Sequence, residues 1–336
     1  MPKVDVWLAN SVLEAASRAA ELERTGVDGV FTFENAHDVF FPLVAAAPAC
    51  SLDLMTNVAI AFPRSPLHLA HAAYDLHALS GGRFRLGLGS QIRTHVERRY
   101  GGVWGKPVAH MREVVAATKA VLDGWQHGTP IDFRGEYTTH TLMTPVFDPG
   151  PNPFGVPKVL VGALGPRMTA MAAEVADGLL VMPFNTERHM RERTTPAIDA
   201  GLQAAGRARQ DIEVVAEVIV ATGRTEEELR AAEAARFIVA FYGSTPAYRP
   251  VLEVEGWEAL QPELNALSKR GEWQTMVTLV DDDLFGRIAV RGTPTEAAAE
   301  IRRRFPDCDR VCAYFPGYSP SDELIAEFAA AVKGAP

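Results

Sequence analysis

The chain contains 336 residues, of which 47% are hydrophobic and 22% are charged, and it carries a formal net charge of −9. This balance is typical of a globular protein with a large core, and no cluster of Lys and Arg is long enough to grip a nucleic-acid backbone. No apolar run approaches the roughly 20 residues of a membrane span, and the N-terminus lacks the pattern of a secretion signal. The sequence therefore predicts a cytoplasmic protein with neither a nucleic-acid nor a membrane partner.

Apolar segments with the pattern of strands alternate with segments of helical spacing along the chain. Strands are predicted at residues 3–9, 27–33, 54–62, 83–89, 158–163, 178–182, 212–221 and 309–315. Helices are predicted at residues 11–25, 66–79, 108–124, 166–176, 187–205, 225–241, 293–305 and 321–333. Two inserts are predicted to be irregular, at about 125–156 after the fourth helix of the barrel and at about 243–285 after the seventh.

This alternation predicts parallel βαβ units, and eight of them favour a closed (β/α)8 TIM barrel, formed as one domain by residues 1–336. An open Rossmann-like sheet is the alternative. It is disfavoured because no G-x-G-x-x-G motif stands between the first strand and the first helix.

The three cysteines, Cys50, Cys308 and Cys312, are too few and odd in number for a disulfide framework. No partners at metal-ligand spacing surround the last two, so we expect small buried residues and no metal site.

Polar residues follow the second predicted strand, where a parallel barrel places its catalytic groups. Glu34, Asn35 and His37 are predicted to belong to the site, and Asp38 is predicted to be the N-cap of the next helix. A polar loop that only caps this helix is the alternative.

The third and fourth strands also end in unusual residues. Asn57 interrupts an apolar strand, either to bind a ligand or because it lies at the solvated end of the strand. Gly87 and Gly89 leave the fourth strand without side chains, as happens where another surface approaches a backbone closely. Ser90 and Gln91 then offer neutral hydrogen-bonding groups.

His95 follows this strand and is either a titratable group of the site or a surface histidine on a helix.

The segment 161–167 is the strongest signal for an anion. A strand ends there, Gly165 makes the turn, Pro166 opens a helix, and Arg167 lies in the first turn of that helix. Free N–H groups, the helix dipole and the guanidinium group all favour a phosphate. A plain turn with a solvated arginine is the alternative. Together with the absence of hydrolase and metal motifs, this pattern predicts a phosphorylated redox cofactor.

Several motifs occur in the order found in one known family. They are Arg64-Ser65-Pro66, Leu79-Ser80-Gly81-Gly82-Arg83-Phe84, Leu86-Gly87-Leu88-Gly89, Gly165-Pro166-Arg167-Met168 and Ala176-Asp177-Gly178. Over nearly its whole length the chain resembles the bacterial luciferase-like family of flavin- and deazaflavin-dependent barrels, and within it the actinobacterial branch that uses coenzyme F420.

The resemblance implies a homodimeric (β/α)8 barrel with F420 at the C-terminal end of the strands and a non-prolyl cis peptide bond at Asn57-Val58. The cofactor-binding residues that it implies are Asn35, Asn57, Val58, Gly89, Ser90, Gln91, Gly162, Leu164, Gly165, Pro166 and Arg167.

The chain departs from the family at one point that affects catalysis. Many deazaflavin relatives have Asp-His or Glu-His after the second strand, whereas this chain has Glu34-Asn35 with His37 two residues later. Glu34, His37 and His95 are therefore the candidates for proton transfer.

The resemblance predicts an F420-dependent oxidoreductase that transfers a hydride between deazaflavin C5 and a small-molecule substrate, with the two inserts shaping the substrate pocket. The alternatives are an FMN-dependent monooxygenase on the same fold, a non-catalytic flavin- or deazaflavin-binding barrel, and an unrelated barrel enzyme acting on a sugar phosphate.

Overall fold

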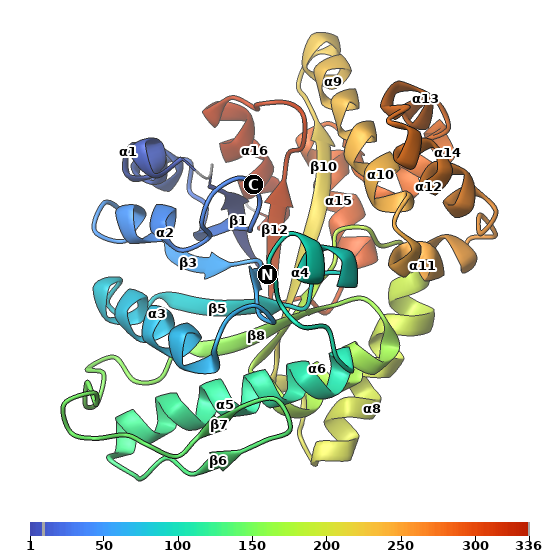
Figure 1. Cartoon of the computed structure of the whole chain (residues 1–336). Helices are drawn as coiled ribbons and strands as arrows, with labels where there is room; N and C mark the ends of the chain where they lie inside the picture. Colours follow the sequence, from blue (N-terminus) through green and yellow to red (C-terminus); the bar gives the residue numbers. More distant parts are fainter. Residues whose placement is uncertain (9–10, 335–336) are drawn as a thin grey trace.

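The computed structural model describes residues 1–8 and 11–334 of the chain. Parallel strands form a closed barrel in the order β1-β2-β3-β5-β8-β9-β10-β12, with β12 pairing back to β1 (Figure 1). These strands are β1 (Lys3–Trp7), β2 (Gly29–Thr32), β3 (Asp53–Thr56), β5 (Phe84–Gly89), β8 (Lys158–Ala163), β9 (Gly178–Val181), β10 (Glu213–Thr222) and β12 (Arg310–Tyr314). The predicted (β/α)8 barrel is confirmed. Residue 9, at the end of the first predicted strand, lies outside the described residues.

Most of the helices that alternate with the strands surround the barrel in Figure 1, whereas α4 lies in front of it in this view and α10 lies with the helical insert. These helices are α1 (Val12–Arg24), α2 (Phe41–Ala46), α3 (Pro66–Leu79), α4 (Arg93–Arg98), α5 (Pro107–His127), α6 (Pro166–Val175), α7 (Glu187–His189), α8 (Thr195–Ala205), α9 (Glu226–Ala232), α10 (Arg236–Gly243), α15 (Pro294–Arg304) and α16 (Asp322–Val332). A π-helical segment, Met190–Thr194, separates α7 from α8 where one continuous helix was predicted. No helix in the described part of the chain combines the length and apolar character that crossing a bilayer requires.

The third predicted strand is divided in two. β3 ends at Thr56 and β4 (Ala59–Ile60) follows, with a cis peptide bond at Asn57-Val58 between them. The side chain of Thr56 replaces part of the interrupted ladder, because its Oγ1 accepts from the backbone N of Gly87 at 2.9 Å and donates to the carbonyl of Gly87 at 2.8 Å.

The two inserts differ in structure. The first, between α5 and β8, carries a short antiparallel hairpin of β6 (Phe133–Arg134) and β7 (Thr139–His140). The second, predicted to be irregular, is instead helical. Its helices are α11 (Arg249–Glu253), α12 (Leu260–Arg270), α13 (Trp273–Thr278) and α14 (Asp282–Ile288). Leu252, Leu264 and Phe285 are buried in one hydrophobic cluster that these helices share with α10.

Strand β10 joins this helical insert to the barrel. It is ten residues long, and its last three residues pair with β11 (Val290–Gly292), which follows α14. In Figure 1 the helices α10–α14 lie together beside the end of β10.

The interior of the barrel is filled in layers. The middle layer is apolar and consists of Phe31, Met55, Leu160, Leu180, Val215 and Cys312, all buried. Burial of Cys312 agrees with the sequence prediction, and Cys50 and Cys308, which are partly buried, are also free thiols. Because side chains block this layer, a ligand has access only from the ends of the strands.

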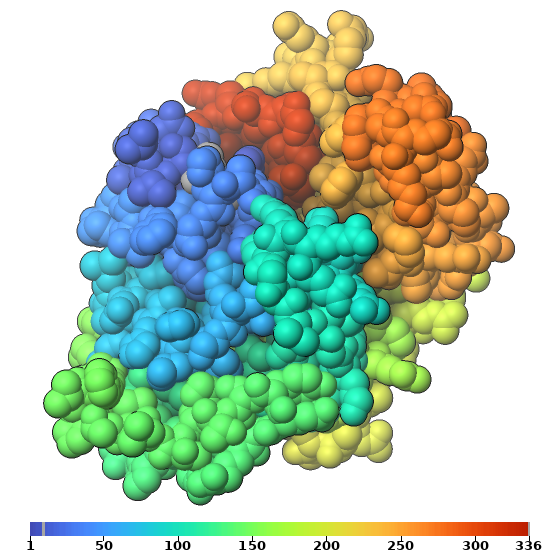
Figure 2. Space-filling model, viewed as in Figure 1, coloured from blue at the N-terminus to red at the C-terminus, as the bar shows by residue number. Residues whose placement is uncertain are grey.

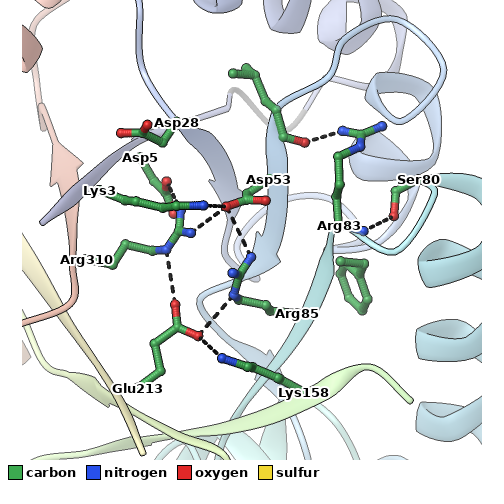
Figure 3. Close-up of polar contacts among 12 residues, drawn as sticks. Lys3, Asp5, Asp28, Asp53, Ser80, Arg83, Arg85, Lys158, Glu213 and Arg310 are labelled. Carbon is green, nitrogen blue, oxygen red and sulfur yellow. Dashed lines mark hydrogen bonds and ion pairs between the residues drawn. The ribbon is translucent and has the colours of Figure 1, made fainter. Parts of the chain in front are cut away.

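The layer at the N-terminal end of the strands is ionic (Figure 3). It consists of Lys3, Asp5, Asp53, Arg85, Lys158, Glu213 and Arg310. Arg310 is fully buried and forms ion pairs with all three acids. Oε2 of Glu213 accepts from Nζ of Lys158 at 2.9 Å and from Nε of Arg85 at 3.2 Å.

Burial and these ion pairs act together on the acids: the pKa values of Glu213 and Asp53 are lowered, and the pKa of Asp5 is raised. Burial raises the pKa of Glu213 and of Asp53, but Arg85 and the other cations outweigh it and hold both values at about 2. For Asp5 burial is the larger effect and raises the pKa to about 6, despite the neighbouring Arg310.

Candidate active site

A cavity of about 710 Å³ opens at the C-terminal end of the barrel strands. Its walls come from the segments that follow β2, β3, β5, β8 and β9, from β10, and from α10 and the turn after it. Figure 2 shows the surface around α4 (teal) and the surface of the helical insert (orange) beside one another on the same face of the molecule. The volume lies within the range of cofactor and ligand sites, roughly 300–1,000 Å³.

One wall of the cavity is a platform made almost entirely of backbone and small groups. Val58 projects there after the cis peptide bond, and a Cβ atom added to Gly89 would lie 2.3 Å from Cγ2 of Val58. A Cβ atom on Gly162 would lie 3.1 Å from Cγ1 of the same residue. Because the two glycines have no side chains, they leave room for Val58, and no side chain projects into the cavity at these two positions. A planar ligand requires such a flat wall.

Asn57 presents an unused hydrogen-bond donor in the same region. Its side chain is 6% exposed, its Nδ2 has no hydrogen-bond partner among the described residues, and the residue lines the cavity. A buried amide donor without a partner costs free energy, so a ligand that accepts this hydrogen bond fits the site.

Glu34 is held in place by strong contacts. Its carboxylate accepts from Nη1 and Nη2 of Arg64 at 2.7 and 3.1 Å, and from the backbone N of Ile60 at 2.9 Å. Arg64 also donates to the carbonyl of Ile60 at 2.8 Å. The pair therefore fixes the chain just after the cis peptide bond, and Glu34 supports the platform while lining the cavity.

The turn between β8 and α6 has the features of an anion site. Gly165 occupies the N-cap without a side-chain cap, and Pro166 is at the first helical position. Arg167 lines the cavity, is exposed, and forms no ion pair with any described residue. Free N–H groups and an unpaired guanidinium group at a helix N-terminus favour a phosphate.

The cavity brings most of the predicted site residues together. Those that line it are Glu34, Asn57, Val58, Gly89, Ser90, Gln91, Gly162, Leu164, Gly165, Pro166 and Arg167. Gln91 has a φ of 58°, which is uncommon for a residue other than glycine and directs the chain around the end of β5.

The remaining predicted residues are not part of the cavity lining. His37 is exposed on the loop after β2, and Asn35 precedes it on the same loop. His95 lies on α4, where burial lowers its pKa and its Nδ1 has no partner among the described residues. Their predicted roles stay predictions. Asp38 accepts hydrogen bonds from the backbone N of Phe40 and Phe41 and so caps the turn before α2, although the N-cap position belongs to Phe40.

The cavity lining also includes residues that were not predicted from the sequence, and the titratable side chains Glu217, Tyr242 and Tyr248 are among them. Glu217 is 8% exposed, and burial raises its pKa to about 8. The signal for it was present, since Glu217 is the one charged residue inside the apolar run 214–221. The two tyrosines belong to α10 and to the short turn Pro246–Tyr248, and no sequence pattern connects them to the barrel.

Fold and site together define a closed parallel barrel with a cavity at the carboxyl ends of its strands, and this cavity extends from the platform at Val58 to the N-terminus of α6. The chain belongs to the luciferase-like monooxygenase family, whose model matches residues 5–306. A protein of Mycobacterium tuberculosis strain H37Rv, described as uncharacterized, is 48% identical over 93% of this chain and 93% of its own. The 5,10-methylenetetrahydromethanopterin reductase of Archaeoglobus fulgidus is 30% identical, over 70% of this chain and 68% of that protein.

Solved structures share the fold along nearly the entire chain. The coenzyme F420-dependent tetrahydromethanopterin reductase of Methanopyrus kandleri superposes with a TM-score of 0.82 at 22% identity, covering 99% of this chain and 98% of that one. The oxygenating constituent of 3,6-diketocamphane monooxygenase of Pseudomonas putida, in complex with FMN, superposes with a TM-score of 0.66 at 14% identity, covering 98% of each chain. Family membership and these relatives make the protein an oxidoreductase.

Proposed function

We propose that this protein is an F420-dependent oxidoreductase that transfers a hydride between C5 of the deazaflavin and a small organic substrate. The observation that carries the proposal is a continuous cavity that joins the low platform of Val58, Gly89 and Gly162 to the N-terminus of α6. A planar ring system with a phosphate-bearing side chain needs these two features at the two ends of one site.

The residues of the cavity fit such a cofactor. Val58 would support one face of the ring, and the free Nδ2 of Asn57 would donate to an acceptor on its edge. The backbone at Gly165 and the side chain of Arg167 would hold the phosphate. When bound, the deazaflavin supplies a carbon that accepts or gives up a hydride, and the protein supplies position and polarity.

The likeness to the Archaeoglobus and Methanopyrus reductases supports F420 as the cofactor. The FMN complex of the Pseudomonas monooxygenase supports FMN as the alternative, because a flavin fits a platform of the same fold. The alternative function is then an FMN-dependent monooxygenase.

Titration of the purified apoprotein with F420 and separately with FMN, followed by cofactor fluorescence, tests the proposal. We expect binding of F420 in the micromolar range or tighter, and weaker binding of FMN. Preference for FMN would favour the monooxygenase. Binding of neither cofactor would overturn the redox assignment, and tight F420 binding without turnover on any substrate would favour a non-catalytic carrier.

A further inference from the structure

Glu217 lies where the barrel wall becomes the wall of the cavity. Ala216 is the last residue of β10 that pairs with β9, at Val181, so Glu217 stands at the level where β9 has ended. On the other side, Glu217 is in register with Cys312 of β12. Side chains alternate along a strand, and Val215, two residues earlier, belongs to the interior layer of the barrel. Glu217 therefore points inward and lines the cavity.

The surroundings of this carboxyl group are uncharged. Cys312 and Tyr314 face it from β12, Tyr242 from α10, and Tyr248 from the turn Pro246–Tyr248. Burial raises the pKa of each of these four groups, and the charge of Glu217 adds a smaller increase. Among the described residues, Glu217 has no salt bridge and no hydrogen bond. Desolvation therefore favours the neutral carboxylic acid, with its pKa raised to about 8.

A neutral acid that faces a ligand cavity and has no internal partner is a hydrogen-bond donor available to the ligand. No cation in the described part of the chain contributes to the pKa of Glu217, and the rings of Tyr242 and Tyr248 line the same cavity. These features select a substrate that is uncharged at its reacting end and that offers an oxygen acceptor.

We propose that Glu217 is the proton donor and acceptor of the reaction and that the substrate is an uncharged carbonyl compound or the corresponding alcohol. This inference rests on the proposed F420-dependent function. In the reductive direction, the carbonyl carbon accepts a hydride, which carries two electrons, from the reduced cofactor. The carbonyl oxygen takes the proton of Glu217, so the C=O π bond is replaced by one C–H and one O–H bond. The alcohol leaves, and the carboxylate regains a proton from solvent. Oxidation of the alcohol is the reverse.

The protonation of Glu217 is testable without cofactor. The native carboxyl group holds its proton more tightly than the unfolded chain, so this group's contribution to stability is present at low pH and is lost as pH rises from about 4.5 to about 8. Glu217→Gln lacks this contribution. We expect the ratio of the unfolding constants of wild type and Glu217→Gln to rise by more than about 100-fold between pH 5 and pH 8, as measured by urea denaturation of the apoproteins.

Glu258→Gln is the matched control, because Glu258 is exposed and does not line the cavity. Its ratio to wild type should stay constant over the same pH range. A constant ratio for Glu217→Gln as well would overturn the inference.

The catalytic role is tested with reduced F420 and a panel of small aldehydes and ketones. We expect Glu217→Gln to bind F420 as wild type does but to lose more than about 100-fold in kcat, with partial recovery in Glu217→Asp. The reductive rate of wild type should fall as pH rises above about 8, where the donor loses its proton.

The outcomes separate this inference from the proposed function. Failure of wild type to bind F420 defeats the proposed function itself. If F420 binds, turnover by wild type of other substrates but of no carbonyl or alcohol overturns the substrate class. Undiminished kcat in Glu217→Gln overturns the role of Glu217.

Discussion

Gly89 is the residue at which the shape of the platform is most sensitive to a single methyl group. Because an added Cβ would lie 2.3 Å from Cγ2 of Val58, Gly89→Ala displaces Val58 or the end of β5. We expect it to lower the free energy of unfolding by about 1–3 kcal/mol and to weaken F420 binding. Urea denaturation and fluorescence titration of the same preparation measure both effects.

Gly165→Ala is the matched comparison. The φ of Gly165 is −72°, which suits alanine, and a Cβ atom there would meet no atom within 4 Å. The stability of Gly165→Ala should therefore equal that of wild type. Its affinity for F420 should fall, because the added methyl group lies where the phosphate is proposed to bind. If Gly89→Ala had the stability and the F420 affinity of wild type, the role of Gly89 in shaping the platform would be contradicted.

A second prediction concerns Glu34, whose contacts indicate support of the platform. Glu34→Gln retains the shape of the side chain but loses the charge that pairs with Arg64. We expect a loss of about 1–3 kcal/mol in the free energy of unfolding and about tenfold weaker F420 binding. Arg64→Lys keeps the positive charge but loses the bidentate hydrogen bonding to Glu34, and we expect the same two effects.

The measurement for Glu34 also separates two roles. If Glu34→Gln binds F420 normally and is stable but has no turnover, the residue is a proton-transfer group, as the sequence predicted, and not a support for the platform.

Among the elements, helix α6 carries the proposed contact with the phosphate. Arg167→Ala should weaken F420 binding about 10- to 100-fold through loss of a charge-assisted hydrogen bond, without changing the thermal midpoint of the apoprotein, because the side chain is exposed. Isothermal titration measures the affinity. Arg230→Ala, an exposed arginine that does not line the cavity, should leave it unchanged. An unchanged affinity in Arg167→Ala would place the phosphate elsewhere.

The sequence predicts the bounds of a helix or strand well when residues inside or next to that element determine them. Strand β8 and helix α3 have the bounds predicted from the sequence, because apolar spacing and the Ser65-Pro66 start determine them locally. The sequence showed Asn57 as an interruption of the apolar pattern, and the family resemblance implied the cis peptide bond that is found there, but the division of the strand into β3 and β4 was not predicted. The second insert was predicted to be irregular because its helices are short and show little helical periodicity in the sequence. They are stabilised instead by the hydrophobic cluster that they share with α10.

The site was predictable to the extent that it lies at strand ends. Asn57, Gly89 and Arg167 follow directly from that rule and line the cavity. Glu217 lies within a strand, and only the unequal lengths of β9 and β10 expose it to the cavity. His37 shows the converse, since a residue that follows a strand still turns outward when its loop does.

For the whole molecule, the ionic layer at the N-terminal end of the barrel determines the response to acid. Glu213 has a pKa of about 2 in the native state, below its ordinary 4.5, so its contribution of about 3 kcal/mol is present above pH 4.5 and is lost as pH falls toward 2. Asp53 acts in the same direction. Asp5, with its raised pKa, opposes them and lowers stability as pH rises from about 4 to about 6.

We therefore expect Glu213→Gln to lower the free energy of unfolding by about 3 kcal/mol at pH 7, because three cations lose a shared acceptor. The difference from wild type should shrink as pH is lowered from 4.5 toward 2. Urea denaturation at several pH values measures it, and F420 affinity at pH 7 should not change. A difference that is independent of pH would contradict this account.

The long strand β10 has a consequence for how such a protein diversifies. The residues proposed to hold the cofactor come from β2, β3, β5 and β8 and the segments after them, whereas Glu217, Tyr242 and Tyr248 come from β10 and the chain that follows it. The two sets thus occupy separate, continuous stretches of the gene. Exchange of residues 217–289 between relatives would replace one set and leave the other intact. Choice of substrate and choice of cofactor are therefore free to evolve independently, by recombination as well as by point mutation.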